Sequence, residues 1–305
     1  MKVAIIGAGN VGATLAMRVL ESGMADVALV DIFRNIAIGK AYDLLDSSSV
    51  VGHERDIIAA DQYDIIRGSD IAVITAGLAR KPGMSREDLI AKNAEVVSGA
   101  ALKIKEYAPK AIVIVVTNPL DTMTFIAKKV TGFDRRRVFG MAGVLDGSRM
   151  VYLIANELGV KRSSVRTLIM GSHGDTMVPI ISQTTVGGKP LSSVMKADKI
   201  DEIVKRTCNR GAEIVSFLGS GSAYYSPSAS VFKMIDCIMN NKLEVMALSV
   251  CLEGEYGHKD MAIGVPCRLG RNGIDEIITL KLAKDEEEAF NRSAAAMRES
   301  IKIAS

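Results

Sequence analysis

The stretch Val3-Ala-Ile-Ile-Gly-Ala-Gly-Asn-Val-Gly12 joins a short apolar run directly to a GxGxxG motif. An apolar run without alternation is typical of a strand that is buried on both faces in a parallel sheet. Gly7 permits a tight turn, Gly9 lets the backbone approach a pyrophosphate, and Gly12 lets the next helix pack close to the sheet. The free N–H groups at the start of that helix favour phosphate. The stretch therefore predicts a dinucleotide-binding strand–turn–helix unit, with glycines that serve packing alone as the alternative.

A second strand, expected over Asp26–Asp31, ends in a carboxylate and supports this prediction. A helix over residues 14–22 lies between the two strands. The Asp31 carboxylate suits the ribose hydroxyls of NAD and would repel the 2′-phosphate of NADP. Arg34, three residues later, keeps NADP open as the alternative. The residues expected to contact NAD here are Gly7, Ala8, Gly9, Asn10, Val11, Gly12 and Asp31.

Strand-like and helix-like segments alternate through about residue 140, which is typical of an open parallel sheet with right-handed crossovers. We expect further strands over 56–60, 71–74, 111–116 and 138–140. The helices are expected over 35–45, 86–108 and 121–131. The fold class is therefore α/β. Residues 1–140 are predicted to form a Rossmann domain with a doubly wound parallel sheet.

The second half has a different pattern, without a linker between the halves. Helices are expected over 145–158, 200–218, 227–239 and from Asp285 onward, and a strand over 165–170. Residues 183–189 read as a hairpin, and an antiparallel meander is expected over 243–252, 261–268 and 273–282. Residues 141–305 are therefore predicted to form an α+β substrate domain.

Composition limits the class of protein. The formal net charge is only +3 and no basic block occurs, so no nucleic-acid partner is expected. The first 20 residues lack the pattern of a signal peptide, and no apolar run is long enough to span a bilayer. The four cysteines form no CxxC pair, which favours a reducing compartment and no metal site. A cytoplasmic protein without membrane attachment is the expectation.

Two loops that follow strands carry polar groups where α/β folds bind ligands. The loop from Thr75 to Arg86 contains three cations, including Arg80 and Arg86, and a solvated surface loop is the alternative for it. The other loop places Asn118 after the strand that ends at Val116. Both loops are predicted to lie at the carboxyl edge of the sheet.

The chain has three histidines, and one of them has the surroundings of a catalytic residue. His173 follows an apolar strand and lies between two glycines in Gly171-Ser-His-Gly-Asp175, so a ligand can approach it. Histidine suits proton transfer near neutral pH. His53 and His258 lie in polar runs and are expected to be exposed turn residues.

Asp146 and Arg149 are three residues apart on a predicted helix and share a face. A surface ion pair is one interpretation. In the other, the carboxylate orients an imidazole and the guanidinium binds an anion through two hydrogen bonds.

These segments together resemble the lactate/malate dehydrogenase family, and within it most closely the lactate-dehydrogenase-like malate dehydrogenases of bacteria and archaea. The resemblance covers nearly the whole chain, in order and in rough spacing. The segments that carry it are Gly7-Ala-Gly-Asn-Val-Gly12, Asp31, Arg80-Lys-Pro-Gly-Met-Ser-Arg86, Thr117-Asn-Pro119, Leu145-Asp-Gly-Ser-Arg149 and Gly171-Ser-His-Gly-Asp175.

The resemblance implies an NAD-dependent malate dehydrogenase of the tricarboxylic acid cycle, active as a homo-oligomer and without a metal. His173 would be the general acid/base in hydride transfer at C2 of (S)-malate or oxaloacetate, with Asp146 as its partner. The substrate would be bound by Arg149 at the C1 carboxylate, Arg86 at the carbonyl, Arg80 at the distal carboxylate, and Asn118. Further cofactor contacts would come from Asn93, Val116, Thr117 and Asn118.

Three alternatives stay open at this point. The same fold acts on lactate or another 2-hydroxy acid, although family members for lactate carry glutamine where Arg80 stands. A dinucleotide-sensing module without catalysis would keep the glycine motif, but His173 and Asp146 argue against it. An NAD-dependent glycosidase would need a metal held by cysteine and histidine, and no cysteine here lies beside a histidine.

Overall fold

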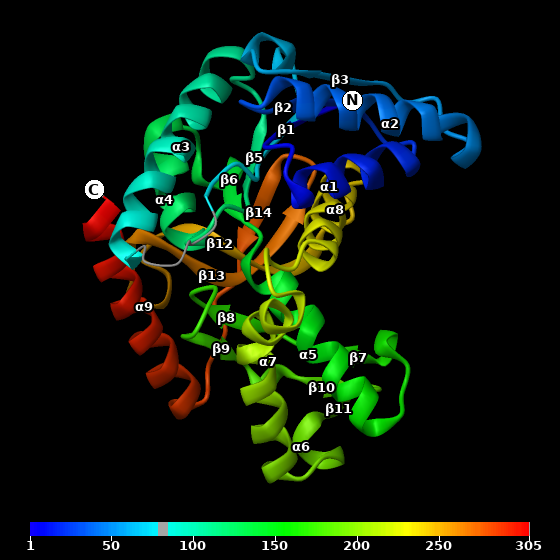
Figure 1. The fold of residues 1–305 in the computed structure, drawn as a ribbon. Coiled ribbons are helices and arrows are strands. Elements are labelled where there is room, and N and C mark those ends of the chain that lie inside the picture. The colour runs from blue at the N-terminus through cyan, green and yellow to red at the C-terminus, as the bar shows by residue number, and fades with distance from the viewer. Residues whose placement is uncertain (79–84, 305) are drawn as a thin grey trace.

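The computed structural model describes residues 1–78 and 85–304 (Figure 1). Six of its strands run parallel, and β1 lies near their middle with neighbours on both sides. Val3 pairs with Val27 on one side and with Ile71 on the other, which explains why this strand is apolar on both faces. In spatial order the strands are β3 (Ile57–Ala60), β2 (Asp26–Val30), β1 (Lys2–Ile6), β4 (Ile71–Ile74), β5 (Ile112–Val115) and β6 (Val138–Gly140).

Helices cover both faces of the parallel strands, as a doubly wound sheet requires. Val3 and Ile5 pack in one apolar cluster with side chains of α1 and α8, while Ala4 and Ile6 pack in another with side chains of α3 and α4. The same two layers are visible in Figure 1. The helices that follow the parallel strands are α1 (Asn10–Glu21), α2 (Arg34–Val51), α3 (Arg86–Tyr107), α4 (Leu120–Thr131) and α5 (Ala142–Leu158).

The sheet continues into the second half of the chain through an antiparallel pairing of β12 with β6, at Ser249 and Gly140. The result is an 11-stranded mixed sheet. Its antiparallel part consists of β12 (Glu244–Glu253), β13 (Lys259–Gly270), β14 (Gly273–Ile277), β8 (Ile169–Gly171) and β9 (Met177–Pro179). The predicted fold class is confirmed, whereas the division at residue 140 stays a prediction.

The remaining elements surround this sheet. A small separate sheet contains β7 (Val165–Arg166), β10 (Thr185–Val186) and β11 (Lys189–Pro190). The other helices are α6 (Leu191–Val194), α7 (Ala197–Leu218), α8 (Tyr225–Met239) and α9 (Lys284–Ala304). Short 3₁₀ turns are η1 (Tyr63–Ile66), η2 (Arg135–Arg137), η3 (Arg162–Ser164), η4 (Ile181–Gln183) and η5 (Glu255–Gly257). Within the described ranges, no helix combines the length and the apolar character that crossing a bilayer requires.

Two predictions about histidines were wrong. His53 and His258 are only 7% and 8% exposed, although both lie in polar runs. The ring of His258 is covered by α9, because its Nδ1 accepts a hydrogen bond from Arg298 at 2.8 Å and its Nε2 donates to Asn291 at 2.9 Å. The local sequence contains no trace of these partners, which come from a distant helix.

The single strand expected over 165–170 is in fact two strands. Val165–Arg166 pairs with the hairpin of the small sheet, and Ile169–Gly171 pairs with β13 and β9 of the main sheet. Thr167 marks the break, where its hydroxyl donates to the carbonyl oxygen of Gly147 at 3.2 Å. The break separates the strand that leads to His173 from the small sheet.

Candidate active site

The glycine turn between β1 and α1 has the shape that a pyrophosphate needs. Gly7 has a φ of +109°, and a Cβ there would lie 2.7 Å from the Ala76 nitrogen, while a Cβ at Gly12 would lie 1.9 Å from the Gly7 oxygen. Nothing lies within 4 Å of the Cβ position at Gly9, which is the exposed N-cap of α1 and has no capping side chain. The first N–H groups of a helix have no intrahelical acceptor. Open space and free donors therefore coincide, and the turn fits the phosphates of NAD.

Two charged side chains hold this turn from the neighbouring elements. Asp31, directly after β2, accepts a hydrogen bond from the Ala8 N–H at 2.6 Å and another from the Phe33 N–H at 2.9 Å. Lys40, on α2, donates from Nζ to the Ala8 carbonyl oxygen at 2.6 Å. Each Asp31 oxygen keeps a lone pair with which a ribose hydroxyl can bond. Lys40 could not be identified from the sequence, because no spacing rule links a lysine on the second helix to the turn.

The structure brings His173 and Asp146 together. His173 follows β8 and Asp146 lies on α5, and the His173 Nδ1 is 2.7 Å from Asp146 Oδ2. Both side chains are shielded, with 13% of the histidine side chain and 1% of the aspartate side chain exposed. An ionised carboxylate only accepts hydrogen bonds, so the proton lies on Nδ1 and Nε2 remains for exchange with a substrate. Burial lowers the pKa of His173, but the nearby Asp146 carboxylate outweighs it and raises the pKa above its usual value.

Arg149 lies one helical turn from Asp146 on α5, and part of its guanidinium bonds no described residue. Its Nη1 is 3.1 Å from Asp146 Oδ1, and its Nε is buried without a hydrogen-bond partner among the described residues. Burial lowers the pKa of this guanidinium, and the Asp146 charge opposes that effect. A buried cationic donor without a partner is costly unless a ligand satisfies it. The arrangement therefore suits a carboxylate bound beside His173.

Asp121, on α4, also lies at this site, although the sequence did not predict it. Its Oδ2 accepts a hydrogen bond from the His173 backbone N–H at 2.7 Å, while its Oδ1 is buried and has no hydrogen-bond partner in the described part of the chain. Burial raises the pKa of Asp121, and the hydrogen bond from the His173 backbone partly offsets this. The two residues are 52 positions apart, so only its place after the strand β5 gave any signal.

The residues expected after β5 lie at the carboxyl edge of the sheet. Thr117 is buried and donates to the Ala76 carbonyl oxygen at 2.6 Å, Val116 beside it is nearly buried, and Asn118 is exposed. Asn93 is buried, and its amide bonds the backbone of Leu78 and the carbonyl oxygen of Asn118, the latter at 2.7 Å. Asn93 therefore fixes the start of one loop against the other.

Two predicted substrate residues cannot be placed. Arg80 lies outside the described residues, and so does the side chain of Arg86, whose backbone begins α3. The start of α3 is a capping box, in which the Ser85 hydroxyl accepts from the Asp88 N–H at 3.0 Å.

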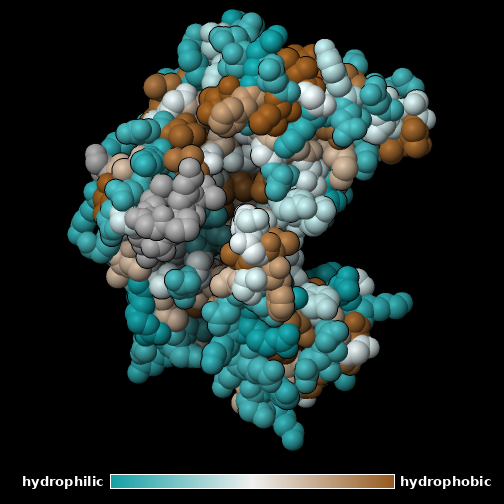
Figure 2. Space-filling model, viewed as in Figure 1, coloured by the Kyte–Doolittle hydropathy of each residue, from teal (hydrophilic) through white to brown (hydrophobic). Residues whose placement is uncertain are grey.

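In the space-filling view, a hollow with an apolar floor lies in the middle of the face shown (Figure 2). Among residues 1–78 and 85–304, no group of three or more His, Cys, Asp or Glu side chains has the arrangement of a metal site.

Two models of one protein family match the chain. The family model for the lactate/malate dehydrogenase NAD-binding domain matches residues 1–140, and the model for the α/β C-terminal domain of the same family matches residues 143–305. A malate dehydrogenase of Trichormus variabilis is 48% identical over 98% of this chain and 93% of its own length.

Solved structures agree with these matches. The apo malate dehydrogenase of Picrophilus torridus superposes with a TM-score of 0.96 at 38% identity, covering 99% of this chain and 97% of that chain. A lactate dehydrogenase of Cryptosporidium parvum, solved with lactic acid and NAD, gives the same TM-score, identity and coverage. Solved structures of a malate dehydrogenase and of a lactate dehydrogenase thus share this fold.

Proposed function

The chain belongs to the lactate/malate dehydrogenase family and is an NAD-dependent oxidoreductase, and on this premise we propose that it interconverts (S)-malate and oxaloacetate. The observation that carries the proposal is the His173–Asp146 pair beside the unsatisfied guanidinium of Arg149. Together, the three residues combine a ring that can exchange a proton, on His173, with a group that can bind a carboxylate, on Arg149. A module that only senses dinucleotides would have no use for either.

Each residue at the pair has one task in the proposed reaction. Bound NAD would supply the acceptor for the hydride that leaves C2 of the hydroxy acid. The Nε2 of neutral His173 takes the hydroxyl proton, and Asp146 stabilises the resulting imidazolium through Nδ1. In the reverse direction, imidazolium donates that proton to the C2 oxygen of oxaloacetate. The pKa of His173, raised by Asp146, favours the imidazolium that this direction needs.

The substrate carboxylates are assigned to arginines. Arg149 binds the C1 carboxylate, because its buried Nε and its second amino group lack protein partners among the described residues. From the family resemblance, we assign Arg86 to the carbonyl oxygen and Arg80 to the distal carboxylate. Asn118 contacts both substrate and cofactor.

The cofactor contacts follow from the glycine turn and the loops beside it. Gly7, Ala8, Gly9, Asn10, Val11 and Gly12 hold the pyrophosphate, with Asp31 at the adenosine ribose. Val116, Thr117 and Asn118 line the nicotinamide end, and Asn93 acts by holding Asn118 in place.

The test is NADH oxidation by the purified protein, followed at 340 nm with oxaloacetate and with pyruvate. We expect turnover with oxaloacetate and a far lower kcat/KM with pyruvate. Pyruvate lacks the distal carboxylate of oxaloacetate. A buried arginine that loses this partner costs about 2–5 kcal/mol, which corresponds to about 30- to several-thousand-fold in kcat/KM. Equal rates with both substrates would favour a dehydrogenase of broader range, and no oxidation with either would refute the proposal.

The residue proposed to make this choice is Arg80. Arg80→Gln should lower kcat/KM for oxaloacetate and raise it for pyruvate, because the distal carboxylate loses its partner while the smaller substrate no longer leaves a charge unpaired. Arg292→Gln, an exposed arginine on α9, is the matched control and should leave the ratio unchanged. An unchanged ratio in Arg80→Gln would remove Arg80 from the role.

We further propose a cytoplasmic homo-oligomer. The four cysteines are free, as is usual in a reducing compartment. Ile36, Tyr42 and Val51 on α2 are large apolar side chains that are at least half exposed, which is typical of an interface. Light scattering that gives a monomeric mass at micromolar concentration would contradict the oligomer.

A further inference from the structure

A second hollow lies far from the proposed substrate, at the amino ends of the parallel strands. It has a volume of about 650 Å³, within the range of small-molecule sites. Ile71 and Ile112 line it from the starts of β4 and β5, and Ile238 lines it from the end of α8. NAD is expected at the carboxyl ends of these strands, so this amino-edge pocket is a separate feature.

Positive charge gathers at the amino-edge pocket. Arg67, Lys110, Arg137 and Arg271 line it from four separate segments, against one carboxylate, Asp70. None of the four cations forms an ion pair with a described residue, although many other lysines and arginines of the chain do. The Oδ2 of Asp70 is already bonded to the Lys2 backbone N–H at 2.8 Å.

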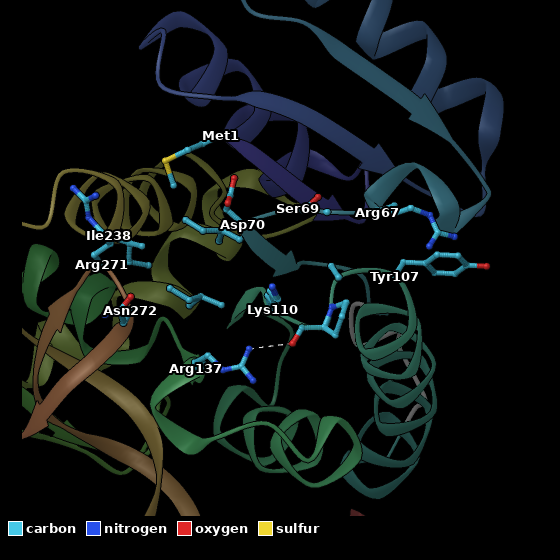
Figure 3. Close-up of a pocket in the computed structure, with 15 residues that line it drawn as sticks. Met1, Arg67, Ser69, Asp70, Tyr107, Lys110, Arg137, Ile238, Arg271 and Asn272 are labelled. Atoms are coloured by element: carbon cyan, nitrogen blue, oxygen red, sulfur yellow. Dashed lines mark hydrogen bonds between the residues drawn. The ribbon is translucent and has the colours of Figure 1, made fainter.

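The close-up shows how these groups lie (Figure 3). Lys110 lies between Asp70 and Arg137, while Arg67 and Tyr107 project to one side, where the guanidinium stacks 5.0 Å from the ring centre. Arg137 donates to the carbonyl oxygen of Pro109 at 3.1 Å and lies 4.5 Å from the ring centre of Phe133, and neither neighbour carries a negative charge. Lys110 and the Arg271 side chain form no hydrogen bond with any residue that the structure describes.

Like charges held around one hollow repel one another, and a cleft concentrates their field on a bound counter-ion. An anion with a single charge would leave most of this field unbalanced. Pro109, which is exposed and precedes Lys110, offers apolar contact for a carbon skeleton.

We propose that the amino-edge pocket binds a small organic anion with two or more negative charges, through Lys110 and Arg137, which lie close together in Figure 3. A phosphate ester and a polycarboxylate share this chemistry. The bound anion would lie between the start of β5 and η2, where Arg137 lies. The inference does not depend on which hydroxy acid the enzyme uses.

Calorimetric titration tests the proposal with two probes, 2,3-bisphosphoglycerate and citrate. The protein is first saturated with NADH and hydroxymalonate, so that the probes cannot occupy the proposed cofactor and substrate sites. We expect binding of at least one probe with a Kd of about 1 mM or tighter. Binding of bisphosphoglycerate alone assigns a phosphate ester, and binding of citrate alone assigns a polycarboxylate.

The variant Lys110→Gln/Arg137→Gln should weaken that binding about tenfold or more, because it removes two charged donors. Lys189→Gln/Arg292→Gln makes the same change in charge at exposed positions elsewhere and should bind like the wild type. Unchanged NADH oxidation in both variants would show that they are folded. The proposal is overturned if neither probe binds the wild type up to about 10 mM, or if the first variant binds as tightly as the second.

Discussion

His173 is held by two different carboxylates, one for its ring and one for its backbone. Asp146 fixes the proton on Nδ1, and Asp121 accepts the backbone N–H at 2.7 Å. The ring can therefore neither slide away from Asp146 nor change tautomer without losing a buried hydrogen bond. Nε2 is left as the only ring atom for proton exchange, as the proposed reaction requires.

Replacing Asp146 by asparagine should move the pH dependence of catalysis. Asp146 raises the pKa of His173 against the opposing effect of burial, so the imidazolium persists to higher pH in the wild type. Oxaloacetate reduction needs this form and falls as pH rises through the pKa. In Asp146→Asn the pKa drops, so the fall in kcat/KM should occur at lower pH, and turnover should decrease by about 10²- to 10⁴-fold.

Asp175→Asn is the matched control for this profile, because it removes an exposed carboxylate from the loop that carries His173. Its profile should overlay that of the wild type. A profile of Asp146→Asn that falls at the wild-type pH would show that Asp146 does not set the charge of the ring.

The sequence predicted the identity of the residues in this pair but not all that surrounds them. His173 could be distinguished from His53 and His258 by its glycine neighbours and the strand before it. The burial of the other two histidines, and the role of Asp121, depend on partners from other elements. Such contacts become visible only when the chain is folded, because no local pattern encodes them.

At the scale of elements, the glycine turn works together with the helix α2. The Ala8 N–H and the Ala8 carbonyl belong to successive peptide planes, and Asp31 and Lys40 each hold one of them. In a trans peptide the carbonyl and the next N–H point in opposite directions. By fixing the Ala8 carbonyl, Lys40 therefore directs the Gly9 N–H away from α2 and towards the space over the turn.

Lys40→Met should accordingly weaken NADH binding by about tenfold or more, the effect of losing a hydrogen bond from a charged donor. Titration of NADH fluorescence measures this without any substrate. Turnover at saturating NADH should change little, because Lys40 is far in sequence and structure from the His173 pair. Lys129→Met, an exposed lysine on α4, controls for the loss of charge. Equal NADH affinity in the two variants would mean that the turn holds its shape without Lys40.

The order and type of the strands and long helices were predictable, while several ends were not. The helix after the glycine turn begins at Asn10 and not at residue 14, since glycine itself acts as its N-cap. Helix α2 extends to Val51, six residues past the expected end, through polar serines that carry no periodic signal. Apolar periodicity reports burial, and these helix ends are largely exposed.

At the scale of the whole molecule, the main sheet joins the two halves of the chain through very few backbone pairs. β6 and β12 share one pairing, between Gly140 and Ser249. Beside it, Arg135 on η2 forms two hydrogen bonds with Glu255 on η5, at 2.8 and 3.1 Å, and both side chains are only 18% exposed. Arg135 also donates to the Cys251 carbonyl oxygen at 3.1 Å. This ion pair therefore fastens the start of β6 to the end of β12.

Glu255→Gln should lower the melting temperature at pH 7, because it breaks a largely buried pair and leaves Arg135 charged. Burial raises the pKa of Glu255, but Arg135 outweighs it and lowers the pKa to about 2. Since the usual pKa of glutamate is about 4.3, the pair stabilises the fold fully above that value and loses this contribution as the pH falls towards about 2. We expect a loss of about 1–3 kcal/mol at pH 7 and a smaller difference between variant and wild type near pH 3.

Glu276→Gln, at an exposed pair with Arg268, should cost less than about 1 kcal/mol. Calorimetric melting at both pH values measures this, and a Glu255→Gln deficit that is absent at pH 7, or as large at pH 3 as at pH 7, would contradict the role of the pair in joining the halves.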